Sequence, residues 1–275
     1  MDQLQFLAAP FVASLVLAGI HTYLGLHVVE RGVIFVDLAL AQIAALGWAV
    51  AVWYGIEPHS TEAYLFSLAF TFLGAAVFAG VRGRESNIPL EAIIGIAYAV
   101  SSAATVLVMS KAVGETEHLE HMLVGNILFV SWAEVGKTAA LYGAIGAFHY
   151  VFRRAFLAVS LNPGLERYGG LSVRVWDLLF YASFGFVVTS SVSIAGVLLV
   201  FCYLIVPSVG AMLFARTIGR RLLIGWTMGA LVSTLGVLLS LSLDFPTGGT
   251  IVCTFGLVLI LMAVGKQLSM RFRNA

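Results

Sequence analysis

Charge is scarce in this sequence. Charged residues make up 11% of its 275 positions and hydrophobic residues 60%, and the mean hydropathy is +1.00. A soluble globular domain carries roughly 25% charged residues. A water-soluble fold cannot bury so much apolar surface, so we expect lipid to be the solvent for most of the chain.

Cysteine and the common catalytic motifs are also nearly absent. The two cysteines, Cys202 and Cys253, both lie in apolar runs and indicate neither a disulfide framework nor a paired-cysteine metal site. The sequence contains no GxxxxGK[ST] phosphate-binding loop, no HExxH pair and no nucleophile elbow. We therefore expect no catalysis by this chain, and if it pumps, the energy must come from another one.

Long apolar runs fill the sequence instead. A membrane crossing needs about 20 apolar helical residues, and nine windows of that kind leave only short loops between them. We therefore predict an all-α polytopic membrane bundle of eight to nine transmembrane helices, in one domain over residues 1–275, in the inner or plasma membrane. The division between the sixth and seventh windows is marked only by the polar stretch at residues 189–193, so one of them could be a half-crossing. The windows are 4–28, 33–55, 62–81, 90–111, 132–152, 176–192, 195–215, 222–242 and 248–266.

The few charges are distributed unequally between the two sides. If the N-terminus is outside and all nine windows span, thirteen of the fifteen lysines and arginines lie at inner ends and loops, and only Lys111 and Lys137 lie outside. This bias is the positive-inside signature of membrane proteins. It predicts that the inner loop near residues 153–175 faces the cytoplasm.

That inner loop contains residues typical of the start and the end of a helix. Asn162 can cap a helix, Pro163 fits its first turn, and Gly169 and Gly170 would end it. We predict a short amphipathic helix over residues 160–170, at the membrane surface, able to dock on a soluble partner.

Five segments, in order along the chain, carry a resemblance to a known family. The chain resembles the membrane permeases of the ABC-type divalent-metal importers, which take up zinc, manganese or iron. The first segment resembles a basic turn followed by G-D-A-L-A-H, and the others resemble E-x-x-I-G-I, L-F-G-N-I-L, G-x-L-L-V-x-x-L-L-I-x-P and D-x-P-T-G-P-x-I-V. The matching segments here are 30–42, 90–96, 123–128, 196–207 and 244–252.

The resemblance implies the ABC importer permease fold and an assembly around it. Two copies of the permease would form the path, two cytoplasmic ATPase subunits would drive it, and an extracytoplasmic metal-binding protein would deliver zinc or manganese. It implies no bound cofactor besides the transported metal, and no nucleic-acid partner. The residues that would couple to the ATPase are Asn162, Pro163, Leu165, Glu166 and Gly170.

The sequence departs from the family where the metal should bind. The family carries Asp and His four apart on its second helix, and those positions are Leu38 and Gln42 here, with a carboxylate one place earlier at Asp37. One residue is about 100° of helix rotation, and imidazole and carboxylate prefer different metals. Three interpretations stay open: loose binding with selectivity in the binding protein, ligands located elsewhere, or a different cargo.

Three residues within the spans are candidates for the path. Asp37 is a carboxylate in a membrane segment, which faces a cavity or a partner; the alternative is an ion pair with Arg31 or hydration by lipid headgroups. Gln42 either contacts the ion or hydrogen-bonds a neighbouring helix. Pro207 removes a backbone donor and is predicted to kink or break its helix, either beside the path or as an ordinary kink.

The outer loop near residues 112–131 holds a second group of possible ligands. His118 and His121 lie three apart and could share a helical face, with Glu117 and Glu120 beside them. This loop is interpreted as a site of metal capture or of docking to the binding protein, and the alternative is a solvated acidic loop.

Three other functions compete. A permease for chelated iron or a cobalamin-like cargo would need no ligands for a bare ion. An ion-coupled secondary carrier would need several buried carboxylates, and Asp37 is the one acidic residue well inside a predicted span. A non-transporting membrane scaffold would need no polar path.

Overall fold

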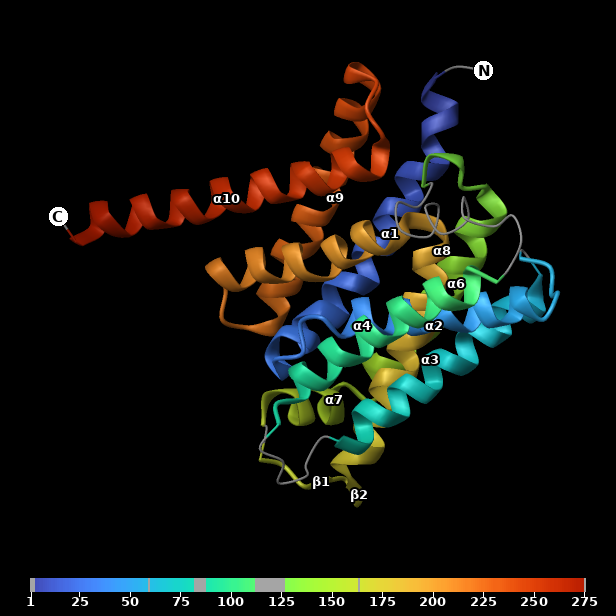
Figure 1. The fold of residues 1–275 in the computed structure, drawn as a ribbon. Coiled ribbons are helices and arrows are strands. Elements are labelled where there is room, and N and C mark those ends of the chain that lie inside the picture. The colour runs from blue at the N-terminus through green and yellow to red at the C-terminus, as the bar shows by residue number, and fades with distance from the viewer. Residues whose placement is uncertain (1–2, 59, 82–87, 112–126, 163, 275) are drawn as a thin grey trace. The chain divides into compact units, whose positions relative to one another are not determined.

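The computed structural model describes residues 3–58, 60–81, 88–111, 127–162 and 164–274 (Figure 1). Over these residues the chain is almost entirely helical, with one short antiparallel hairpin that pairs Arg167 with Ser172. The elements are α1 (Gln3–Arg31), α2 (Val36–Trp53), α3 (Thr61–Val81), α4 (Leu90–Met109), η1 (Ile127–Phe129), α6 (Trp132–Val151), α7 (Arg153–Leu161), β1 (Arg167–Tyr168), β2 (Leu171–Ser172), α8 (Val173–Phe214), α9 (Ile218–Leu243) and α10 (Thr247–Asn274).

The predicted helical membrane fold is confirmed. Each of the nine predicted windows falls on a helix, and seven described helices are long and apolar enough to cross a membrane. Helix α6 is not among the seven, because Glu134, Lys137 and His149 lower its hydropathy.

Helix α8 accounts for two of the predicted windows. It has 42 residues, which is roughly 63 Å of helix against a hydrocarbon core of about 30 Å. Gly196 interrupts it with φ 73° and ψ 161°, a conformation that requires glycine. The helix continues through Pro207, so it is not broken there, and a kink at that proline, the other predicted outcome, stays a prediction. Membrane helices tolerate proline because neighbouring groups compensate for the lost hydrogen bond, and the break lies at Gly196 instead.

The chain forms two compact units. The first comprises residues 1–29, 124–140 and 194–275, and the second comprises residues 30–123 and 141–193. The boundary in α8 falls beside the interruption at Gly196. The prediction of a single domain over residues 1–275 stays a prediction.

The second unit is organised around α2. Helix α2 contacts both α3 and α4 (Figure 1), and small residues allow this close packing: a Cβ on Gly47 would lie 2.7 Å from the Phe66 carbonyl oxygen. Helix α2 follows a tight turn in which Gly32 has φ 66° and the Val36 N–H donates to the Val33 carbonyl. The turn places the first residues of α2 beside the start of α4.

In the first unit, hydroxyl groups and close backbone contacts join helices of low polarity. The Ser208 hydroxyl donates to the Thr22 carbonyl at 3.1 Å, and the Trp226 indole N–H donates to the Gly19 carbonyl at 2.9 Å. Helices α9 and α10 form a hairpin (Figure 1). Its turn is closed by Asp244, which has φ 55°, and by the hydroxyls of Ser240 and Thr247 at 2.8 Å.

The inner loop contains the predicted short helix at a different position. Helix α7 ends at Leu161, so the predicted helix over residues 160–170 is wrong. Asn162 is a C-cap rather than an N-cap: its side-chain Nδ2 donates to the Ala158 carbonyl at 2.8 Å. The residue before a proline is driven out of the helical region, and Asn162 accordingly has φ −123° and ψ 90°.

Candidate functional site

The family's metal-ligand positions lie on α2 and carry no metal ligands of the expected kind. Leu38 and Gln42 are four apart and share a face of the helix, and Gln42 is 8% exposed. Asp37 is five residues from Gln42, which is about 140° around the helix. Asp37 therefore does not stand in for the missing aspartate at the same place on α2.

Asp37 lies instead at the N-terminal turn of α2, next to a second carboxylate. It is 2% exposed, and its carboxylate interacts with backbone N–H groups of residues 37 and 38 and, electrostatically, with Glu91 at the start of α4. Glu91 Oε1 accepts a hydrogen bond of 3.2 Å from the Phe35 N–H. Two acidic side chains from neighbouring helices thus meet at the end of α2.

Each of these two carboxylates keeps one buried oxygen without a hydrogen-bond partner among the described residues. The atoms are Asp37 Oδ1 and Glu91 Oε2. An unpaired buried carboxylate oxygen is costly, and a second negative charge beside it increases the cost. A proton or a bound cation would compensate the burial of this pair.

Arg31 does not supply that positive charge. The alternative in which Arg31 pairs with Asp37 is wrong: its guanidinium binds Asp177 of α8 at 2.5 Å, and both side chains are fully buried. Arg31 also donates to the Ser160 hydroxyl at 2.8 Å and lies 3.9 Å from the centre of the Phe180 ring. It joins the end of α1 to α7 and α8.

Helix α7 is held by aromatic side chains around that ion pair. Phe156 is fully buried and stacks on His149 of α6, with ring centres 4.2 Å apart. Trp176 and Phe180 of α8 contact the same ring at 5.7 and 6.3 Å. We call Phe156, His149, Trp176, Phe180 and Arg31 the α7 anchor. It makes α7 a firm attachment point for the inner loop.

The loop that follows α7 is exposed. The predicted coupling residues Asn162, Glu166 and Gly170 are all at the surface, and Leu165 is half-buried; Pro163 lies outside the described residues. The two strands are tied to α8, since the Trp176 indole N–H donates to the Tyr168 carbonyl at 3.0 Å. The loop surface is exposed, and its base is fixed to α8.

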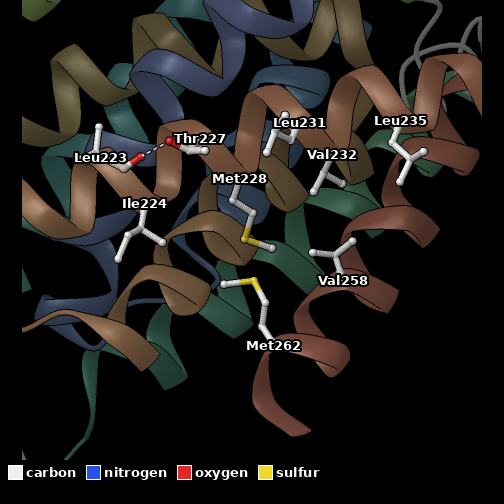
Figure 2. Close-up of a pocket in the computed structure, with 9 residues that line it drawn as sticks. All are labelled: Leu223, Ile224, Thr227, Met228, Leu231, Val232, Leu235, Val258 and Met262. Carbon is white, nitrogen blue, oxygen red and sulfur yellow. Dashed lines mark hydrogen bonds between the residues drawn. The ribbon is translucent and has the colours of Figure 1, made fainter. Parts of the chain in front are cut away.

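A groove between α9 and α10 in the first unit does not suit a bare ion. Its volume is about 480 Å³, and Figure 2 shows the thioether ends of Met228 and Met262 pointing toward each other across it. The single hydroxyl in its lining, on Thr227, donates to the Leu223 carbonyl of its own helix at 2.8 Å. The groove offers no charged group to a hydrated cation.

The remaining predicted ligands are not tested by the structure. His118, His121, Glu117 and Glu120 all lie outside the described residues. Within the described part of the chain, no three His, Cys, Asp or Glu side chains gather as a metal site. Pro207 belongs to the first unit and Asp37 to the second, and their roles in a path stay predictions.

Neither Glu91 nor Asp177 stands out in the sequence as a functional residue. Glu91 starts a helix in a segment that resembles the family, and an acid at a helix start is usually interpreted as stabilising that helix. In the structure the Glu91 carboxylate instead accepts a hydrogen bond from the Phe35 N–H, just before the start of α2. Asp177 lies at the edge of an apolar window, and only its distance in space to Arg31 reveals its partner.

The chain is similar to proteins of a known transporter family. The model of the ABC 3 transport family matches residues 3–266. The chain belongs to the ABC 3 transport family. It is 25% identical to the Chelated iron transport system membrane protein YfeD of Yersinia pestis over 90% of this chain and 81% of that one. It is 24% identical to the Manganese import system permease protein ScaB of Streptococcus gordonii, over 94% and 91% of the two chains.

A solved structure has the same fold. The structure of "PsaBC from Streptococcus pneumoniae in complex with Fab" matches with a TM-score of 0.78 at 23% identity, covering 95% of this chain and 92% of that one. This ABC 3 chain is therefore a multi-pass membrane permease, as its sequence resemblance indicated. ABC permease subunits are not themselves catalytic, and the chain is not expected to hydrolyse ATP.

Proposed function

We propose that this ABC 3 permease forms the path for a divalent metal ion in an ATP-driven importer, with manganese as the leading cargo and zinc as the alternative metal. The observation that carries the proposal is the family match over residues 3–266. Relatives of nearly the same length are named for manganese import and for chelated iron transport. The described donors in the second unit are carboxylate oxygens, which suit manganese better than zinc.

The assembly that this function needs has further parts. Two copies of the permease would enclose the path, a pair of cytoplasmic ATPase subunits would bind the inner loops, and an extracytoplasmic protein would deliver the metal. The exposed surface around Glu166 and Gly170 supports the ATPase contact, because its base is tied to α8. A force applied there would reach α1 and α8 through the α7 anchor.

The function is tested by the metal content of cells that lack this chain. Elemental mass spectrometry should show lower manganese accumulation in the deletion strain, restored by the wild-type chain. A Glu166→Arg variant should reach the membrane and fail to restore accumulation. Its matched control is Glu62→Arg, which changes an exposed acid in the first turn of α3. Unchanged content of manganese, zinc and iron in the deletion strain would refute the proposal.

Chelated iron is the second candidate cargo. Leu38 and Gln42 replace the family's ligands, and a chelate needs no protein ligands for the metal; one relative is named for chelated iron. The same deletion strain separates the two cargoes. A deficit in iron alone, dependent on an added chelator, would favour the chelate over the bare ion.

A further inference from the structure

We propose that Asp37 and Glu91 together form a binding site for a hard divalent cation of the Mn²⁺ class at the inner end of α2 and α4. The inference deepens the proposed function and rests on it for its physiological meaning. It differs from the family's ligand pattern, because neither residue occupies the positions now held by Leu38 and Gln42.

Asp37 and Glu91 each bury a carboxylate oxygen that accepts no hydrogen bond from the described residues. Asp37 is 2% exposed, and its Oδ1 accepts no hydrogen bond from the described residues. Glu91 Oε2 is also buried and unpartnered, although the rest of that side chain is half-exposed. Buried carboxylates are paired, protonated or bound to metal. Since Arg31 is bound to Asp177, the described neighbours leave a proton or a cation as the compensating charge.

The negative charge of the two carboxylates exceeds the positive charge that the N-terminus of α2 offers. Two carboxylates carry a charge of −2, and the N-terminus of α2 contributes about +0.5. The helix end neutralises only about a quarter of that charge, and burial and mutual repulsion favour a protonated pair unless a cation takes the place of the proton. A shared proton would leave about −0.5 and a divalent cation about +0.5, so the charge balance alone allows either, and the Mn²⁺ binding experiment decides between them.

The ligands at this site are carboxylate oxygens, which prefer hard divalent cations. Carboxylate oxygens and water suit Mn²⁺ and Mg²⁺, while zinc sites use nitrogen and sulfur ligands in a closed tetrahedron. Cations of this class are held by one or two carboxylates and keep several waters. The half-exposed Glu91 and the 49% exposed Phe35 leave the site open on one side for a hydrated ion.

The position of the site suggests its place in transport. The lysine and arginine bias puts the start of α2 and of α4 at the cytoplasmic side. A cation bound there has passed the membrane and is next released to the cytoplasm. Asp37 and Glu91 act as a low-affinity site from which the ion is released into the cytoplasm.

The test is Mn²⁺ binding to the purified full-length permease in lipid nanodiscs, measured as loss of the free-ion signal in electron paramagnetic resonance with MnCl₂ alone. Wild-type protein should show saturable binding. Asp37→Asn and Glu91→Gln should each weaken it by about tenfold or more, because even outer-shell changes at metal sites cost about 10- to 100-fold. Glu62→Gln, which changes an exposed acid in the first turn of α3, should bind as wild type.

Folding is controlled in the same samples. Both amides keep an oxygen that can accept the hydrogen bonds at the start of α2, so circular dichroism and size-exclusion profiles should match the wild type. Absence of saturable binding in the wild type, which a shared proton would produce, or wild-type affinity in both variants, would overturn the site. Metal uptake by cells is scored separately: normal uptake in the deletion strain would remove the proposed function while the binding result stands.

Discussion

Two buried aspartates in the same unit have opposite surroundings. Asp177 is held by Arg31 at 2.5 Å, inside the aromatic α7 anchor. Asp37 instead has a second carboxylate, that of Glu91, as its electrostatic neighbour. Removing one partner of a buried ion pair is strongly destabilising, whereas a buried carboxylate beside a like charge is a candidate for a functional group. The comparison is consistent with a structural role for Asp177 and with the proposed cation site at Asp37.

The largest expected effect comes from breaking the compensated pair. Arg31→Met should lower the free energy of unfolding by about 3–5 kcal/mol, because it leaves the Asp177 carboxylate buried without its counter-ion. Thermal unfolding in detergent would measure this. The double variant Arg31→Met with Asp177→Leu should recover much of the loss, and an equally unstable double variant would contradict a role for charge compensation.

A smaller effect is expected at the hydroxyl that joins Arg31 to α7. Ser160→Ala removes one hydrogen bond to a charged group and should lower the stability by about 1.5–3 kcal/mol. Because the link between α7 and α1 is weakened, ATP-driven uptake should fall more than protein abundance does. Uptake normalised to the amount of permease in the membrane checks this, and Ser193→Ala, an exposed serine of α8, is the control.

The uncompensated pair should behave in the opposite way. Asp37→Asn should change the free energy of unfolding by less than about 1 kcal/mol, since the favourable term at a helix start is about 0.3–1 kcal/mol and the repulsion from Glu91 is relieved. Unfolding in detergent with and without MnCl₂ measures it. Stabilisation by Mn²⁺ in the wild type and none in the variant is expected; a large loss of stability without metal would place Asp37 in the scaffold.

The smallest effect on stability is expected in the exposed loop. Glu166→Ala should leave unfolding unchanged within about 0.5 kcal/mol, as for other surface positions, because no described side chain depends on its carboxylate. Uptake should nevertheless fall if this surface binds the ATPase. Pull-down of the ATPase by the wild-type and variant permease distinguishes the two roles, and equal recovery would argue against a contact at Glu166.

The fold could be predicted from the sequence because hydropathy and the positive-inside bias depend only on the order of the residues and not on tertiary contacts. The nine apolar windows give the helices without any tertiary information. The position of the inner helix was wrong because two signals competed at Asn162 and Pro163. Asn162 and Pro163 were interpreted as a helix start. A proline instead keeps the residue before it out of the helical conformation, so α7 ends before Asn162.

The candidate site was only half predictable. Asp37 stands out in sequence as a carboxylate in an apolar window. Its neighbour Glu91 does not, because two residues 54 positions apart in the sequence meet only through the packing of α2 on α4. Asp177 was missed for the same reason. Sequence order reveals a lone charge, and only the fold reveals whether that charge has a partner.

The most direct test is the initial rate of manganese uptake by cells that produce Asp37→Asn in place of the wild-type chain, at equal abundance in the membrane. The account predicts a stable, membrane-inserted permease with a strongly reduced rate, while the Glu62→Gln control takes up manganese as the wild type does. A wild-type rate in Asp37→Asn would contradict the role of the carboxylate pair in carrying the metal.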